Sequence, residues 1–292
     1  LMSFALAEIE TYYSNNATSY FKQLFHIYLA GTEVDYNKRI ETLHWALEKG
    51  NSEFHLMTLK ACSSALSGMG SNTRMMGAEN QGSKIPLKDY QPKNLAEIND
   101  YTNSILLILK RLHEIYDKKI NEIIVSSLYF FSESYYNFHD LKYFFESMIK
   151  FSKSKHKLRK NLVWLKSFEI QYQSQNEVSD EYIAKTEPQT IEEEIKDKVS
   201  NPEYLFSNAG KIDLTKEKCE VFAEKIFNME TDLTKYFSNL FLGEQHQTFN
   251  FGKKYGELKG FNESFLDEIL MFLIDLKEDV NWNISFLHGY LA

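Results

Sequence analysis

The sequence predicts an all-α protein, organised as an α-solenoid or an irregular helical-repeat array of paired antiparallel helices. Three observations predict this class. Apolar residues recur at three- and four-residue spacing along most of the chain, as they do on one side of a helix. Only four prolines and 12 glycines interrupt the 292 residues, so long stretches are free of helix breakers. Alternating strand patterns are scarce outside residues 123–125.

Three amphipathic helices are expected before residue 68. The third contains Cys62, whose spacing assigns it to a buried core position rather than to a nucleophile. The three apolar stripes consist of Phe21, Leu24, Phe25, Tyr28 and Leu29, then Ile40, Leu43 and Leu47, then Leu59, Cys62 and Leu66 within residues 52–67.

A long glycine-marked connection, residues 68–94, follows these helices. A connection of this length is unusual in a compact domain and is normally functional or held by its own packing. It leads into a helix start, because Pro92 favours extended backbone before it and Asn94 and Glu97 have capping-box spacing. We expect this connection to position helices rather than to contact a ligand.

Helical spacing resumes after the connection and continues to about residue 151, as one long helix or two in series. Aromatic residues between 129 and 145 are too closely spaced for one narrow stripe, which predicts that several helices cover them. The stripe before them consists of Ile105, Leu109, Leu112, Ile115, Ile120 and Ile123.

The second half of the chain is divided by a polar, acidic stretch at residues 171–215, in which one short helix is expected at 191–199. Two stripes follow, Phe222, Ile226, Met229, Leu233, Phe237 and Leu240, then Phe265, Ile269, Phe272, Leu273 and Leu276. We therefore divide the chain into an N-terminal helical array (1–175, including the connection at 68–94), a polar acidic variable segment (176–215) and a C-terminal helical array (216–292).

The composition of the chain limits the classes of function that fit it. A content of 43% hydrophobic and 15% aromatic residues predicts a folded core, and a net charge of −8 argues against broad binding to a nucleic-acid backbone. Cys62 and Cys219 lack zinc-site spacing and are typical of a reducing, cytoplasmic compartment. No apolar run approaches the roughly 20 residues that span a bilayer, so no membrane segment is predicted.

No catalytic motif is found. Residues 77–84 carry two glycines at phosphate-loop spacing, but Ser83 precedes Lys84 and no strand leads into the segment, so a glycine-rich turn is favoured. The eight histidines form neither HExxH nor a cluster with cysteine. No serine lies in a GxSxG elbow. We therefore predict no catalytic residue, cofactor or metal in this chain.

A basic segment at residues 150–160 is the densest charge feature. It could meet an acidic partner or a nucleic-acid backbone. The favoured interpretation is a solvated connection between a helix ending near Phe151 and one containing Leu162 and Leu165. Its cations are Lys150, Lys153, Lys155, Lys157, Arg159 and Lys160.

Two sets of short motifs remain. The first comprises GAE at 77–79, QG at 81–82, LKDYQPK at 87–93 and EINDY at 97–101. The second comprises FNFGKK at 249–254 and NISFLHGYL at 283–291. These motifs resemble the C-terminal helical, TPR-like regions of large bacterial STAND NTPases, which include antiviral defence proteins. With the helices from about residue 39 to 66, the resemblance covers under half of the chain.

The resemblance implies a specific role. Such proteins carry an N-terminal effector, a central ATPase that oligomerises, and a C-terminal helical array that senses a foreign protein. This chain would be part of the sensor, with no enzymatic activity of its own, and would oligomerise only through the other domains of its parent. The implied ligand is a folded phage protein, such as the large terminase subunit or the portal, met in the cytoplasm.

Candidate partner-binding residues follow from residue type, because aromatic and arginine anchors dominate protein interfaces. For Arg74, Tyr90 and Tyr101, packing inside the fold is the favoured alternative, and for the cations of residues 150–160 it is the solvated connection. Two other functions stay open, a structural scaffold for protein assembly and a nucleic-acid-associated protein that uses residues 150–160. The candidates are Arg74, Tyr90, Tyr101, Lys155, Lys157 and Arg159.

Overall fold

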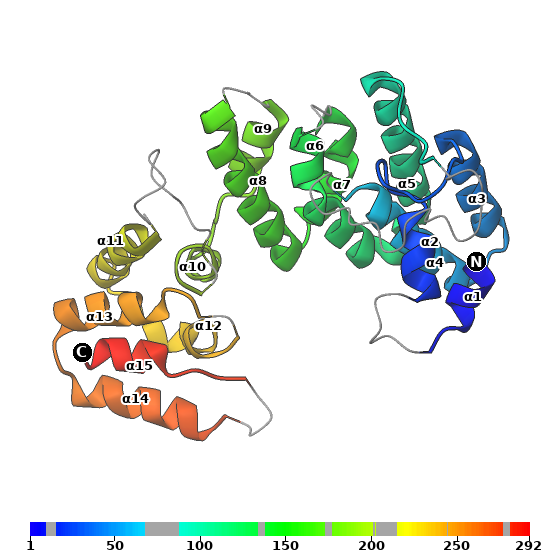
Figure 1. Cartoon of the computed structure of the whole chain (residues 1–292). Helices are drawn as coiled ribbons and strands as arrows, with labels where there is room; N and C mark the ends of the chain where they lie inside the picture. The colour runs from blue at the N-terminus through cyan, green and yellow to red at the C-terminus, as the bar shows by residue number, and fades with distance from the viewer. Residues whose placement is uncertain are drawn as a thin grey trace. The chain divides into compact units, whose positions relative to one another are not determined.

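The regular structure of the described chain is helical throughout (Figure 1), which confirms the all-α prediction. The described part holds one isolated antiparallel bridge, between Leu242 and Trp282, and no longer strand. No helix in it is both long enough and apolar enough to cross a bilayer. The computed structural model describes residues 1–9, 16–67, 88–133, 138–172, 177–200, 202, 215–243, 245–276 and 281–292, with side chains except at 132–133, 152–153 and 167–172.

The chain forms two compact units, Leu1–Phe144 and Phe145–Ala292, each with buried apolar side chains of its own. The predicted divisions at residues 175 and 215 mark changes of composition and stay predictions. Unit 1 contains α1 (Met2–Ala7), α2 (Ala17–Gln23), α3 (Tyr36–Glu48), α4 (Ser52–Ala65), α5 (Leu95–Ser126), α6 (Leu128–Glu133) and the 3₁₀ turn η2 (Phe138–Leu141), and α7 (Lys142–Met148) crosses the boundary.

Asn and Asp side chains start four helices of unit 1, α2, α3, α4 and α5. Each accepts a hydrogen bond from the backbone N–H three residues later, which satisfies one of the free donors of the first turn. The predicted cap at Asn94 is confirmed, since its Oδ1 accepts from Glu97 N at 2.9 Å. The four caps are Asn16, Asp35, Asn51 and Asn94.

The predicted helix at residues 21–29 is wrong beyond Gln23, where α2 ends, and Leu29 has a φ of 55°. Side chains of α3 and α5 satisfy three consecutive carbonyls of the loop that follows, in place of a helical ladder. The donors are Tyr101 to Phe25 (2.9 Å), Arg39 Nη1 to His26 (2.7 Å) and Tyr36 to Ile27 (3.0 Å). Apolar spacing could not reveal these donors, because they lie outside the segment.

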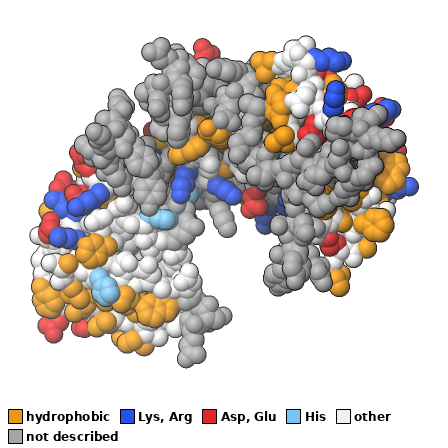
Figure 2. Space-filling view, viewed as in Figure 1, with side chains coloured by type: hydrophobic (Ala, Val, Ile, Leu, Met, Phe, Trp, Pro, Cys, Tyr) orange, Lys and Arg blue, Asp and Glu red, His pale blue; other side chains and the backbone are white. Residues whose placement is uncertain are grey.

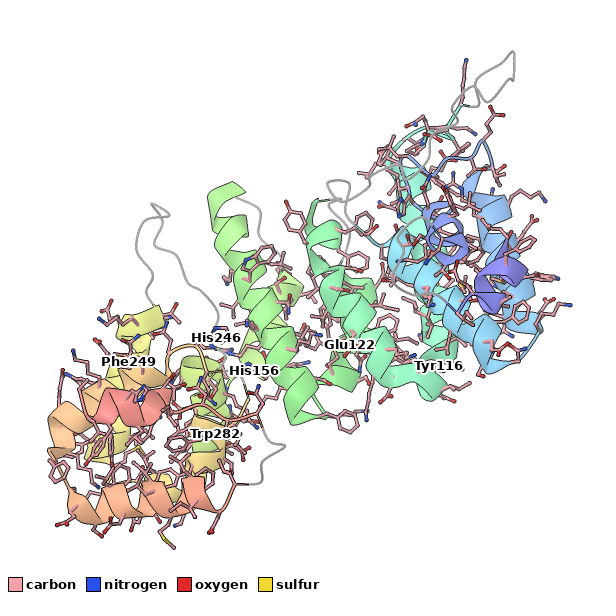
Figure 3. All side chains as sticks on the ribbon, turned by 60° about the horizontal axis from the view of Figure 1, so that its bottom comes forward. Tyr116, Glu122, His156, His246, Phe249 and Trp282 are labelled. Atoms are coloured by element: carbon pink, nitrogen blue, oxygen red, sulfur yellow. The ribbon has the colours of Figure 1, made fainter. Side chains whose placement is uncertain are left out.

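The sequence predicts one long helix or two in series after the connection. Helix α5 combines both, because its 32 residues form one helix with a kink. Tyr116, labelled in Figure 3, has non-helical angles of φ −129° and ψ 34°. Ile115, next to the kink, is 63% exposed, so its predicted place on the buried stripe is wrong. Residues 123–125, the strongest strand signal, lie inside this helix.

Unit 2 is a second helical array, and it contains the predicted short helix at 191–199 as α10 and the π-helical turn η3. Its core brings together aromatic and aliphatic side chains of η3, α11, α12, α13, α14 and α15. Its elements are α8 (Ser152–Tyr172), α9 (Glu177–Lys185), α10 (Ile191–Ile195), η3 (Lys196–Ser200), α11 (Thr215–Asn228), η4 (Leu233–Tyr236), α12 (Phe237–Phe241), α13 (Thr248–Lys259), α14 (Glu263–Ile274) and α15 (Ser285–Tyr290).

The predicted stripe from Phe222 to Leu240 is divided among α11, η4 and α12. Helix α11 ends at Asn228, and Glu230 takes a left-handed φ of 49°. Glu230 N donates to Phe227 O at 3.0 Å and Thr231 N to Ile226 O at 3.2 Å, the two bonds of a Schellman motif. Met229, predicted on the buried stripe, is 55% exposed because the chain turns there.

Helices α13 and α15 touch backbone to backbone through three glycines. A Cβ on Gly256 would lie 2.5 Å from Tyr290 O, and a Cβ on Gly252 would clash with Phe286 O. A Cβ on Gly289 would clash with Phe249 O and lie 2.8 Å from Lys253 N. Only glycine fits such an approach. The second set of motifs in the sequence therefore forms one tight helix crossing.

Candidate functional site

The structure divides the predicted partner-binding residues into two groups. Tyr90 and Tyr101 lie together in unit 1, and Lys155, Lys157 and Arg159 lie on α8 of unit 2. Arg74 lies outside the described residues. Their role in partner binding stays a prediction, but their contacts show what each side chain already does within its unit.

The tyrosine group of unit 1 surrounds the buried side chain of Arg39. The Tyr36 and Tyr101 rings stack with centroids 4.4 Å apart, and Tyr90 meets Tyr36 edge-on at 5.1 Å. The Arg39 guanidinium lies 5.0 Å from the Tyr36 centroid and 5.9 Å from that of Tyr90. Burial raises the pKa of both Tyr36 and Tyr101, so their hydroxyls stay protonated donors.

Tyr90 ties the end of the long connection to α5 and to the loop before α3. Its N–H donates to Thr32 O at 2.8 Å, and its hydroxyl donates to Glu97 Oε1. The hydrogen bond to Glu97, with burial, raises the pKa of Tyr90 to about 12. Glu97 Oε2 also accepts from Lys93 N at 2.6 Å, which completes a capping-box arrangement. Both tyrosines thus contribute to the architecture of unit 1.

The basic segment is a helix face, so its prediction as a solvated connection is wrong. Residues 152–160 form the first turns of α8, and α7 ends at Met148. Lys155 Nζ lies 3.1 Å from Glu193, and Arg159 Nε lies 3.2 Å from Asp197. The acidic partners are therefore residues of the same chain. Sequence reasoning missed them because they are 38 residues away.

Lys157 differs from its two neighbours. It is exposed, whereas the side chains of Lys155 and Arg159 are only 13% and 16% exposed in their ion pairs. Arg159 Nη1 also donates to Ile183 O at 2.9 Å, which links α8 to α9. Of the three, Lys157 alone can be changed without breaking one of these internal contacts.

A cleft of about 560 Å³ lies beside Arg159, between α8, η3 and α11. Phe222, which is 2% exposed, forms an apolar floor, and Val221 at the mouth is 59% exposed. Lys198 Nζ lies 4.9 Å from the Phe222 ring centroid, and Lys225 Nζ lies 6.0 Å from it. The cleft is thus an apolar pocket with amines placed over an aromatic ring.

Glu194 holds these two amines in place. Its carboxylate lies 2.6 Å from Lys198 Nζ and 2.6 Å from Lys225 Nζ. Burial by itself raises the pKa of Glu194, but the hydrogen bonds from Lys198 and Lys225 outweigh burial and hold that pKa below its usual value. The carboxylate stays charged near neutral pH and keeps the lysines directed across the cleft.

The rim of the cleft carries more positive than negative charge. Its described lining residues include four cations, Arg159, Lys198, Lys218 and Lys225, and two anions, Asp197 and Glu217, and with Glu194 the four cations face three anions. An excess of cations beside an apolar floor favours a ligand group that is apolar and adjacent to a carboxylate. Apolar spacing assigned Phe222 to a core stripe and left Lys198 and Lys225 unassigned, because three separate segments build the cleft.

The two cysteine thiols, which are common catalytic groups, do not line the cleft and are not reactive. Cys62 and Cys219 are buried, and burial raises the pKa of the Cys62 thiol and raises that of Cys219 to about 12, so neither is a ready thiolate. Within the described ranges, no group of three His, Cys, Asp or Glu side chains is arranged to hold a metal ion.

Comparison with protein-family models, with curated proteins and with solved structures finds no match to this chain.

Proposed function

We propose that this chain is the ligand-sensing part of a bacterial antiphage STAND NTPase, and that binding of a foreign protein, such as the phage large terminase subunit or the portal, triggers oligomerisation of the parent protein. The observation that carries the proposal is the cleft of unit 2, with its apolar floor and cationic rim. The motifs at residues 77–101, 249–254 and 283–291 supply the family to which we assign it.

The cleft suits the anchoring of a protein ligand. Its volume of about 560 Å³ lies within the usual range of roughly 300 to 1,000 Å³ for binding pockets. A few side chains inserted into such pockets supply most of the affinity of protein interfaces. We infer that the ligand inserts a large apolar side chain that is followed or preceded by Asp or Glu.

The test uses the purified chain of residues 1–292 with purified large terminase subunit and purified portal, and measures binding by calorimetry. The double variant Lys218→Glu with Val221→Asp places negative charge at the exposed mouth of the cleft, and it should weaken binding at least tenfold, about 1.4 kcal/mol. Lys216→Glu is the matched control, because Lys216 lies on the same helix, outside the cleft, with a side chain 60% exposed.

Two outcomes contradict the proposal. If neither phage protein binds the unaltered chain, the assigned ligands are removed. Equal binding by the cleft variant and the Lys216→Glu control, with unchanged thermal melting, means that the ligand binds elsewhere. Concentration-dependent self-association without any phage protein supports the scaffold alternative instead.

A further inference from the structure

Helix α14 is apolar on two opposite sides. Phe265 and Ile269 are buried, and Phe272 packs against the rings of Phe237 and Phe241 with centroids 5.5 and 5.7 Å away. A helix at the surface of a globular protein needs only one such stripe. The residues that face away from this core therefore need a separate explanation.

The outward side of α14 exposes three large apolar side chains. Leu270 is 41% exposed, Met271 is 60% exposed and Ile274 is 75% exposed. Leu270 and Ile274 are four residues apart and Met271 and Ile274 are three apart, and these spacings make neighbours on the helix surface. In Figure 2, hydrophobic side chains gather over the part of unit 2 drawn at lower left, where Figure 1 places α14. A contiguous exposed patch of this kind is typical of an interaction site, unlike scattered apolar residues.

All charges on this helix are negative. Residues 263–276 include Glu263, Asp267, Glu268 and Asp275 and no Lys or Arg. Within the described part of the chain, none of these four carboxylates takes part in an ion pair, whereas the lysines of α8, η3 and α11 pair repeatedly. Steps of four residues place Glu263 and Asp267 in line with Met271, so carboxylates border the apolar patch.

We propose that the outward face of α14, formed by Leu270, Met271 and Ile274 with Glu263, Asp267 and Asp275, binds an amphipathic helix of a partner protein that carries Lys or Arg beside its apolar stripe. Apolar contact supplies the affinity, and charge complementarity selects a basic helix over an acidic one. A stripe with apolar residues at three- and four-residue spacing matches the patch.

This surface is distinct from the cleft in its chemistry. The cleft has a cationic rim and favours a carboxylate, whereas α14 is acidic and favours amines or guanidinium groups. One ligand group cannot suit both. The inference therefore stands on α14 alone and does not depend on the function proposed for the cleft.

The test uses a synthetic helical peptide of about 18 residues, roughly five turns, with Leu on one side and Lys on the other, and a matched peptide with Glu in place of Lys. Binding to the full-length chain is measured by fluorescence anisotropy at two salt concentrations. The chain should bind the Lys peptide at least tenfold more tightly than the Glu peptide, and less tightly at high salt.

Variants separate this face from the acidic surface as a whole. Met271→Gln with Ile274→Gln should weaken binding of the Lys peptide about tenfold. Asp267→Lys with Asp275→Lys should weaken it as well and should strengthen binding of the Glu peptide. Leu107→Gln, which removes an apolar side chain that is 66% exposed on α5, is the matched control and should change nothing. Thermal melting of each variant confirms that it is folded.

Two results overturn the proposal. Equal binding of the Lys peptide by the unaltered chain and by Met271→Gln with Ile274→Gln means that general attraction to an acidic protein explains the binding. A dimer of the unaltered chain in sedimentation, dissolved by the same two substitutions, means that a second copy covers the face.

Discussion

The described regions around the two sets of motifs are stabilised by opposite means. In unit 1, Tyr36, Arg39 and Tyr101 extend side chains to the backbone carbonyls of a neighbouring loop. In unit 2, Gly252 and Gly289 have no side chain, so two helix backbones meet directly. The contacts in unit 1 depend on long polar side chains, whereas the contact in unit 2 depends on glycines, which have no side chain.

This difference shows what such motifs report. In both regions motif residues fix how two helices or a helix and a loop are joined, and three of these residues, Tyr101, Gly252 and Gly289, are buried within their own unit. The cleft beside Arg159 and the outward face of α14 lie outside both sets of motifs. A resemblance carried by these residues therefore describes architecture, and the residues that choose a partner have to be found from the surface.

The largest expected effect is at the glycine crossing. Gly289→Ala places a methyl group against Phe249 O and Lys253 N, backbone atoms that cannot rotate away, and should destabilise unit 2 by about 3 kcal/mol. Urea unfolding followed by circular dichroism measures the loss. His288→Ala is the control, because His288 is exposed on the same helix. Equal stability of Gly289→Ala and the control would show that α13 and α15 can separate without cost.

The polar cluster of unit 1 should come second. Arg39→Met keeps most of the apolar stem but leaves the carbonyls of Val34 and His26 without their donor, a loss of about 2 kcal/mol. Lys38→Met, one residue earlier on the exposed face, should change stability by less than about 0.5 kcal/mol. A thermal shift no larger for Arg39→Met than for Lys38→Met would remove the contrast between the two units.

Matched capping boxes allow a comparison of equivalent positions in the two units. Glu97 and Glu193 each lie three residues after a capping side chain, Asn94 and Thr190, and each accepts from a backbone N–H before that cap. Glu97→Ala should cost about 1 kcal/mol. Glu193→Ala should cost more, about 2 kcal/mol, because it leaves the charged amine of Lys155 unpaired, whereas Glu97→Ala leaves the neutral hydroxyl of Tyr90 without its acceptor. Chemical denaturation of both variants gives the order, and a larger loss for Glu97→Ala would contradict it.

The last prediction is a pH dependence in unit 1. Burial, with the nearby charges of Lys22 and Arg39, lowers the pKa of His26 to about 4, so the folded chain binds fewer protons than the unfolded chain between about pH 6.5 and 4. His26 should therefore cost stability as the pH falls through this range. The variant His26→Gln should lose less stability than the unaltered chain between pH 7 and 4.5. Parallel stability curves for the two proteins would contradict the assignment.

The sequence predicted those helices whose apolar spacing or capping residues lie within the helix or next to it. The stripe of Leu59, Cys62 and Leu66, the cap at Asn94 and the short helix at 191–199 all depend on neighbours within a few residues. Features that depend on distant residues were missed. Beyond Gln23 the chain leaves the predicted helix, and side chains from α3 and α5 bind its carbonyls instead. On α8, Lys155 and Arg159 pair with Glu193 and Asp197.

The candidate site was predicted less completely than the fold. Arg159 was selected for its type, and the structure places it at the edge of the cleft, but Phe222, Lys198 and Lys225 were not selected. Phe222 has the spacing of an ordinary core residue, and the two lysines look like solvated charges in sequence. Glu194 gives them a shared direction, and its distance of 31 residues from Lys225 hides that relation from any local pattern.

The glycine crossing also bears on the order in which unit 2 folds. Helix α15 has only six residues, too few to be stable as an isolated helix in water. Its turns can persist only once the groove of α13, lined by Gly252 and Gly256, is present to receive it. The Tyr290 hydroxyl then donates to Gly260 O at 3.0 Å and accepts from Asn262 N at 3.1 Å, which fixes the turn into α14. Docking of six residues thus joins three helices, and the amide protons of α15 should exchange with solvent at least as fast as those of α13, because α15 cannot persist without α13.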